Sequence, residues 1–255
     1  MRRSRTLAKL RAGEPVRICS LGHFFPAFIR HAAHCGYDCI WLDMEHRALS
    51  DQQAQTLIAY CCMSDIDCMV RPPTLEKTRL YRYLEDGATG LMIPHVSTAE
   101  KAAMLADAAK FPPLGDRGLD AAGLDADYYV DPSEAYTDEA NRETFLIVQI
   151  ETPLAVENIE AIAGTPGVDG MFVGPADLGL RLNRLKSRLC LDEALRRVAQ
   201  AAARGGKAWG CPTPTVEGIR SLRAMGAQLI AYGGDFPAMA QSLEGWSRDW
   251  DSAGS

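Results

Sequence analysis

The sequence predicts a single (β/α)8 TIM barrel, an α/β fold in which eight parallel strands form an inner barrel that helices surround. Three observations lead to this prediction. Short apolar runs rich in β-branched residues occur eight times, the segments between them have helical periodicity, and 255 residues is the usual size of such a barrel. No segment rich in Pro, Gly and Ser divides the chain, so we expect residues 1–255 to form one domain.

The expected strands and helices alternate along almost the whole chain. Each strand is a short apolar run, and turn residues follow most of them. The strands are Val16–Leu21, Asp38–Leu42, Asp67–Val70, Gly90–Ile93, Phe145–Ile150, Gly170–Val173, Ala208–Cys211 and Gln228–Ala231. The clearest helices are Pro26–His34, Ser50–Met63, Leu75–Leu84, Thr98–Ala109, Leu154–Ala163, Leu191–Ala203 and Val216–Met225.

The N-terminal segment is rich in Arg and contains no acid before Glu14. Leu7, Leu10 and the basic residues around them are typical of a short amphipathic helix, which we expect to be part of the fold. A transit peptide is the alternative for this segment, which lacks the apolar stretch of a secretory signal.

The composition is that of an ordinary globular protein, with 47% hydrophobic and 24% charged residues. A net charge of −6 and a pI near 5.4 argue against nucleic acid or an anionic membrane as a partner. No apolar run approaches the ~18 residues of a membrane helix. The eight cysteines contain no C-x-x-C motif and mostly lie in apolar runs, which fits a reducing, cytoplasmic compartment.

Two carboxylates follow neighbouring strands of the expected barrel. Glu151 comes directly after Phe145–Ile150, and Asp177 comes shortly after Gly170–Val173. Because the carboxyl ends of parallel strands meet on one face, both acids are expected on the face where barrel enzymes carry their active sites. Two such carboxylates can hold a hard cation such as Mg²⁺, with water and substrate oxygens as further ligands. The alternative is two surface acids that cap helices.

Other polar residues occupy the same end of the remaining strands. They are Asp43, Glu45 and His46 after the second strand, Arg71 after the third, His95 after the fourth, Gln149 within the fifth and Asp235 after the eighth. His46 could instead be a structural histidine, Arg71 a structural ion pair, and Glu45 a brace for its loop. We also expect the longest connection, residues 111–144, to start from this rim.

Six different short motifs are distributed along most of the chain. They are Leu42–His46 (LDMEH), Val70–Pro73 (VRPP), Gly90–Ala99 (GLMIPHVSTA), Pro112–Gly118 (PPLGDRG), Gln149–Thr152 (QIET) and Gly174–Leu178 (GPADL). In this order and spacing they resemble the HpcH/HpaI family of metal-dependent, class II pyruvate aldolases. That family includes aldolases of 2-keto-3-deoxy sugar acids and of 4-hydroxy-2-oxoheptanedioate.

The resemblance implies a role for each matched residue. These roles are metal ligation by Glu151 and Asp177, acid–base catalysis by His46 oriented by Asp43, and pyruvate binding by Arg71, Gln149 and the backbone N–H around Ala176. It also implies a homo-oligomer, commonly a hexamer built from dimers that exchange a C-terminal helix, which residues 236–250 would supply. The cation would be Mg²⁺ in the first place, with Mn²⁺ or Co²⁺ as alternatives.

The chemistry of these residues agrees with that implication. A 2-keto acid chelates a hard cation through its carboxylate and carbonyl oxygens, so that charge from a breaking C3–C4 bond collects on oxygen. The chain would then cleave or form a 4-hydroxy-2-keto acid through a metal-bound pyruvate enolate. A Schiff-base aldolase would need a lysine at a strand's carboxyl end, and none of the six lysines is expected there.

Two other functions remain open. The same enolate could serve oxaloacetate decarboxylation or a specialised carbon–carbon bond formation, or the barrel could bind a metabolite without catalysis. Four segments depart from the family pattern and leave the acceptor aldehyde undetermined. They are residues 22–26, 119–136, 181–188 and 209–214. The basic segment 181–188 could attract a second carboxylate or a phosphate, or could be a solvated helix face.

Overall fold

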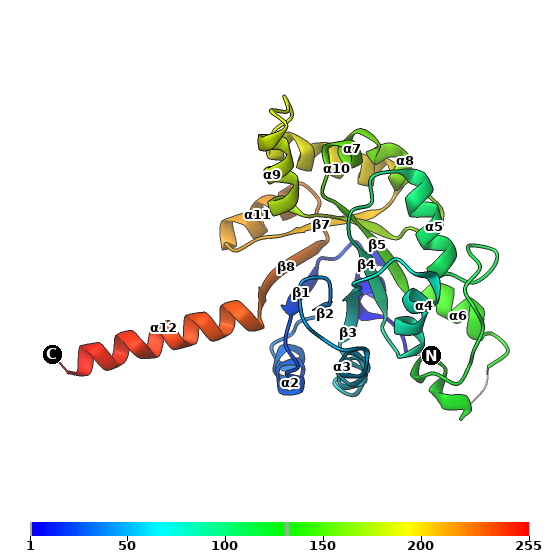
Figure 1. The fold of residues 1–255 in the computed structure, drawn as a ribbon, viewed down its shortest axis with the longest axis horizontal. Coiled ribbons are helices and arrows are strands. Elements are labelled where there is room, and N and C mark those ends of the chain that lie inside the picture. The colour runs from blue at the N-terminus through cyan, green and yellow to red at the C-terminus, as the bar shows by residue number, and fades with distance from the viewer. Residues whose placement is uncertain (1, 131–132, 255) are drawn as a thin grey trace.

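The computed structural model describes residues 2–130 and 133–254. In this part of the chain eight parallel strands pair in chain order and close into a barrel, which confirms the predicted fold class (Figure 1). The strands are β1 (Val16–Leu21), β2 (Cys39–Asp43), β3 (Asp67–Arg71), β4 (Gly90–Ile93), β5 (Phe145–Ile150), β6 (Gly170–Val173), β7 (Ala208–Pro212) and β8 (Leu229–Gly234).

Helices surround the barrel and follow nearly every strand. They are α1 (Arg5–Arg11), α2 (Pro26–His34), α3 (Asp51–Met63), α4 (Lys77–Glu85), α5 (Ala99–Ala109), η1 (Leu124–Tyr129, a 3₁₀ turn), α6 (Tyr136–Glu143), α7 (Pro153–Glu157), α8 (Ile159–Ala163), α9 (Pro175–Arg184), α10 (Leu191–Gly205), α11 (Val216–Ala224) and α12 (Asp235–Ala253). The helix predicted at Leu154–Ala163 is two helices, because the chain turns at Asn158, whose side chain donates to Ser97 O at 2.9 Å.

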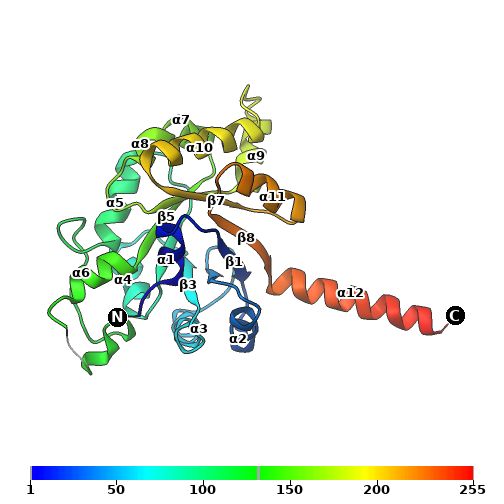
Figure 2. The same cartoon turned by 180° about the vertical axis from the view of Figure 1, so that it is seen from behind.

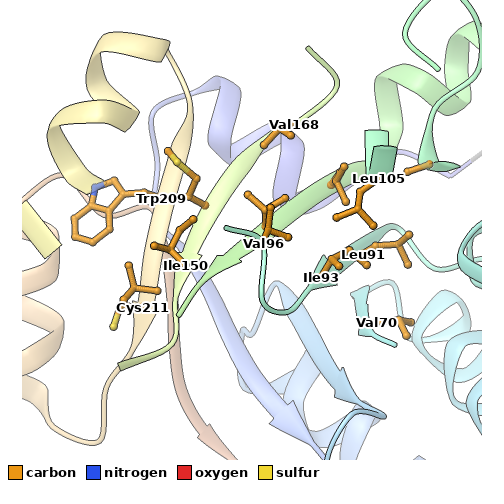
Figure 3. Packing of buried hydrophobic residues seen from close by; sticks show 14 of the residues in the cluster. Val70, Leu91, Ile93, Val96, Leu105, Ile150, Val168, Trp209 and Cys211 are labelled. Carbon is orange, nitrogen blue, oxygen red and sulfur yellow. The ribbon is translucent and has the colours of Figure 1, made fainter. Parts of the chain in front are cut away.

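Two layers of buried side chains hold the barrel together. Side chains that point inward form one cluster, in which Phe145 and Phe172 are the largest members. Gly90 leaves the room that the Phe145 ring fills, since a Cβ there would lie 2.1 Å from the ring. Side chains that point outward form the larger layer between strands and helices, part of which Figure 3 shows, including Val70, Ile150 and Trp209.

The N-terminal segment is an integral part of the barrel, as predicted. Asp67, at the amino end of β3, accepts hydrogen bonds from Ser4 Oγ and from the backbone N–H of Thr6, both at 2.7 Å. Leu7 joins the inward-pointing cluster and so contributes to the barrel's core at that end. The α1 helix therefore closes the end of the barrel opposite the strand carboxyl ends.

The connection at residues 111–144 does not start from the active-site rim, and that prediction was wrong. It joins the end of α5 to the start of β5, so it leaves from the opposite end of the barrel. Glu143 accepts from the Ser4 backbone N–H at 3.0 Å, which ties this segment to α1 (Figure 2). Its own buried centre is an ion pair of Arg117 with Asp125 at 2.8 Å.

Helix α12 extends away from the barrel in both views (Figures 1 and 2). No helix in the described ranges is both long and apolar enough to cross a membrane. All eight cysteines lie in these ranges, and none takes part in a disulfide.

Candidate active site

The alternation of side chains along β5 decides which of its residues enter the barrel mouth. Phe145 and Ile147 belong to the inward-pointing cluster, whereas Leu146 and Val148 pack against the helices. The period of two continues to Gln149 and Glu151, which therefore point to the inside at the strand's carboxyl end. Both side chains are buried.

Asp43 and Arg71 are the last residues of β2 and β3 and face each other in the strand register. Arg71 Nε donates to Asp43 Oδ1 at 3.0 Å, and Arg71 Nη2 lies 2.8 Å from Asp43 Oδ2. Burial alone would raise the pKa of Asp43, but hydrogen bonding and charge from Arg71 outweigh it and lower that pKa. The guanidinium also lies 4.7 Å from the centre of the Trp41 ring, so it is a fixed cation.

His46 follows this pair on the loop after β2. Asp43 Oδ1 accepts from the backbone N–H of His46 at 3.3 Å, so Asp43 orients the residue through its backbone. The imidazole faces Glu45, with His46 Nε2 at 3.5 Å from Glu45 Oε2. The His46 ring is more than half exposed and is accessible to a ligand.

Glu45 lies between Arg71 and His95 in a cluster of charged side chains at the barrel mouth, although the sequence indicated only that it could brace the loop. Its Oε2 is 3.1 Å from Arg71 Nη1, and its Oε1 is 3.5 Å from His95 Nε2. Oε2 is buried and accepts no hydrogen bond from any residue in the described ranges. Arg71 offsets the charge of this oxygen, and bound water or a ligand can supply a well-aligned donor.

His95 connects Glu45 to Glu151. Its Nδ1 lies 2.9 Å from Glu151 Oε2, and its backbone N–H donates to the same oxygen at 3.2 Å. The backbone of His95 is left-handed, with φ of 56°, a conformation that costs a non-glycine residue about 1 kcal/mol or more. The strained turn places the ring Nδ1 and the backbone N–H of His95 beside the same oxygen of Glu151. The sequence around His95 does not reveal this arrangement.

The Glu151 carboxylate lies directly over Gly174, at the end of β6. A Cβ at Gly174 would come within 2.6 Å of Glu151 Oε1, so only glycine leaves room for the acid. Burial is the main cause that raises the pKa of Glu151, with His95 opposing it and the charges of Glu45 and Asp177 adding to it. Negative charge is therefore concentrated where a cation would relieve it.

Asp177 stands in the first turn of α9, close enough to influence Glu151 electrostatically. Its Oδ1 accepts from Arg181 Nη1 at 2.7 Å, and the same nitrogen donates to Glu151 O at 3.0 Å. Arg181 belongs to the basic segment 181–188, whose role the sequence left open. In the folded chain this arginine is a partner of the predicted metal ligand.

The donor set fits a hard divalent cation that keeps open positions. Among the described residues, no group of three or more His, Cys, Asp or Glu side chains is arranged to enclose a metal. Glu151 and Asp177 would supply two carboxylates, and water and substrate oxygens would complete the shell, which is how Mg²⁺ is usually bound in enzymes. The raised pKa of Glu151 agrees with a carboxylate that needs a cation.

Two further predicted residues offer groups to a ligand. Gln149 Oε1 is buried and has no hydrogen-bond partner within the described ranges. Ala176 is exposed in the first turn of α9, where backbone N–H groups have no partner inside the helix and attract anions. Pro175 precedes it and has no N–H, so Ala176 carries the first free donor of this helix.

Comparison with known proteins agrees with this arrangement. The model of the HpcH/HpaI aldolase/citrate lyase family matches residues 20–241. The hydroxypyruvate/pyruvate aldolase of Deinococcus radiodurans is 34% identical over 91% of this chain and 84% of its own. The 2-keto-3-deoxy-L-rhamnonate aldolase of Klebsiella pneumoniae is 32% identical, covering 84% of this chain and 80% of its own.

A solved structure extends the similarity to the whole fold. The HpcH/HpaI aldolase from Desulfitobacterium hafniense superposes with a TM-score of 0.87 at 30% identity, covering 95% of each chain. The match reaches all six motifs that the sequence presents. This chain belongs to the HpcH/HpaI aldolase/citrate lyase family and is a carbon–carbon lyase.

Proposed function

We propose that this chain is a divalent-metal-dependent aldolase that cleaves or forms a 4-hydroxy-2-keto acid through a pyruvate enolate. The network that joins Arg71, Glu45, His95 and Glu151 beside Asp177 carries this proposal. Relatives named as hydroxypyruvate/pyruvate aldolases support pyruvate or hydroxypyruvate as the donor. The partners are then small molecules, a 2-keto acid and an aldehyde.

Glu151 and Asp177 would hold the cation, which we propose to be Mg²⁺, with Mn²⁺ or Co²⁺ as alternatives. When bound, the cation polarises the keto group and stabilises negative charge on its oxygen. Arg181 would remain beside Asp177 and fix the direction of its carboxylate. His95 would do the same for Glu151 through its ring and its backbone N–H.

Arg71, Gln149 and Ala176 would bind the donor. Arg71 is pinned by Asp43 and Trp41, so its charge is already in place when a carboxylate or developing enolate arrives. The free N–H of Ala176 at the α9 terminus suits a carboxylate oxygen. The unpartnered Gln149 amide would complete the contacts.

His46 would move the proton. In cleavage, its ring takes the proton of the C4 hydroxyl, the C3–C4 bond breaks, and the electron pair becomes the enolate of pyruvate as the aldehyde leaves. Proton transfer to C3 then gives the methyl group of pyruvate. An imidazole nitrogen can both take up and release a proton in such a step, and the carboxylate of Glu45 faces the ring at 3.5 Å.

The first half of this mechanism can be tested without knowing the aldehyde. An enzyme that forms the enolate exchanges the methyl protons of pyruvate with deuterium from solvent in a metal-dependent manner.

We also place the enzyme in the cytoplasm, since eight free cysteines suit a reducing compartment.

We further propose that α12 packs against a second copy of this chain, as in a dimer-based hexamer. Large apolar side chains recur along its exposed face with alternating spacings of three and four, the pattern of a helix–helix seam. They are Phe236, Met239, Leu243, Trp246 and Trp250. The helix leaves the barrel (Figure 1), and the members of the stripe beyond Phe236, from Met239 to Trp250, are each at least 50% exposed.

Charge on the stripe is expected to dissociate the oligomer. The double substitution Trp246→Glu and Trp250→Glu would place carboxylates in an apolar seam, which is strongly unfavourable. Light scattering after size-exclusion chromatography should show the mass of one chain, with an unchanged circular dichroism spectrum. Arg248→Glu, on the opposite face of α12, is the matched control. An unchanged mass for the double variant would remove α12 from the interface.

A further inference from the structure

A third histidine at the barrel mouth, besides His46 and His95, is held by a buried carboxylate and belongs to no function assigned so far. His23 follows β1, and Asp235 begins α12 directly after β8. Asp235 Oδ2 accepts from the backbone N–H groups of Gly22 and His23, both at 3.0 Å, and lies 2.7 Å from His23 Nδ1. The Asp235 side chain is only 6% exposed, while that of His23 is 49% exposed.

These contacts leave one nitrogen of His23 available for a ligand. A carboxylate can only accept, so it favours the tautomer in which Nδ1 carries the proton. In the neutral ring Nε2 is then a hydrogen-bond acceptor, and it points away from Asp235 on the other side of the imidazole. Within the described ranges no residue hydrogen-bonds His23 Nε2. Asp235 thus orients the His23 ring through Nδ1, and Nε2 on the opposite side of the ring is available to a ligand.

Further contacts fix His23 in relation to the loop that carries His46. The His23 ring packs on Phe236 with centroids 4.3 Å apart, and the Arg47 guanidinium lies 4.9 Å from the centre of the same Phe236 ring. Arg47 Nη1 donates to His46 O at 2.8 Å. The loops after β1 and β2 therefore pack on a common side chain, and His23 has little freedom to turn.

The order of the strands shows which part of the mouth His23 occupies. The residues proposed for metal, pyruvate and proton transfer come from β2, β3 and the ends of β5 and β6. The strands β7, β8 and β1 close the remaining sector, and β8 pairs directly with β1. A substrate bound by its keto-acid end at β3 to β6 can extend the groups beyond its C4 atom toward this sector, where His23 follows β1.

We infer that His23, positioned by Asp235, is a specificity-determining residue that accepts a hydrogen bond from a hydroxyl group of the acceptor aldehyde. This inference rests on the proposed function, because it assigns the half of the reaction that follows enolate formation. The favoured acceptors are hydroxyaldehydes, and the corresponding deoxy aldehydes are poorer because they leave Nε2 without a donor.

The test compares two acceptors that differ by one hydroxyl. Aldol addition of pyruvate to glycolaldehyde and to acetaldehyde is measured with Mn²⁺ in the full chain and in His23→Phe, which keeps a ring against Phe236 but has no Nε2. We expect wild-type kcat/KM to favour glycolaldehyde and the preference to fall about tenfold in the variant. His34→Phe, at the exposed end of α2, is the matched control and should keep the wild-type preference.

Deuterium exchange of pyruvate, measured in the same samples, tests the proposed function separately from the role of His23. Exchange in wild type and in His23→Phe, with a preference that the variant does not change, would overturn the role of His23 and leave the proposed function standing. The inference also fails if wild type exchanges pyruvate protons but does not prefer glycolaldehyde. Absence of exchange in wild type would overturn the proposed function itself and with it the role of His23.

Discussion

Glu151→Gln is expected to lower aldol turnover about a thousandfold and to weaken Mn²⁺ binding by at least a factor of about ten, because it removes one of two charged ligands. Asp177→Asn should behave in the same way. Both changes keep the shape of the side chain, and Gln at 151 still fits over Gly174. Burial and neighbouring negative charge raise the pKa of Glu151, so its neutral replacement should not destabilise the fold.

The measurement is Mn²⁺ titration by electron paramagnetic resonance, together with steady-state turnover. Glu157→Gln, on the neighbouring helix α7 and outside the cluster, is a matched control that should leave both values unchanged. Near-normal turnover, or Mn²⁺ affinity equal to wild type in both variants, would show that these acids do not hold the cation.

His46→Asn should slow retro-aldol cleavage about a hundredfold while Mn²⁺ affinity stays at the wild-type value, since general acid–base groups contribute factors of about 10² to 10⁴. His46 contacts Glu45 but neither predicted metal ligand, so loss of its ring should not disturb the cation. The combination of slow turnover and intact metal binding separates a proton-transfer role from a structural one.

His31→Asn, on α2, provides the matched control for loss of an imidazole outside the cluster. Unchanged turnover in His46→Asn would remove His46 from the mechanism. Because His95 is the imidazole that contacts Glu151 directly, it would then be the next residue to test for proton transfer.

The sequence predicted the barrel because its strands are short apolar runs that turn residues end, and each is followed by a helical pattern. Errors in strand bounds have a physical cause. β2 and β3 extend to Asp43 and Arg71, since these two charged residues pair with each other across the ladder and continue the strands. Apolar runs alone end one residue earlier in both places.

The site was predicted as a set of residues but not as a network. The sequence places Glu45 and His95 at strand ends, but it does not show that they connect the predicted acids and bases. Glu45 acquires its role from Arg71 at the end of β3 and from His95 on the turn after β4, and His95 from a left-handed backbone that only the folded turn defines. Arg181 becomes the partner of Asp177 because α9 places them one turn apart.

The prediction that residues 111–144 start from the active-site end of the barrel was wrong for a different reason. Its length and its Gly, Arg and Tyr residues are typical of an active-site loop, but the direction of the chain decides its place. A segment that leads from a helix into a strand lies at the amino end of a parallel barrel, and Glu143 accordingly binds Ser4 beside α1.

Proton exchange at the methyl group of pyruvate tests the central claim most directly. EDTA-treated protein is incubated with pyruvate in D₂O, with and without added Mg²⁺ or Mn²⁺, and the methyl signal is followed by proton NMR. The account predicts exchange that appears with metal, disappears with EDTA and is lost in Glu151→Gln. Exchange that persists without metal, or protein that binds pyruvate and metal yet never exchanges the protons, would contradict a metal-dependent enolate mechanism.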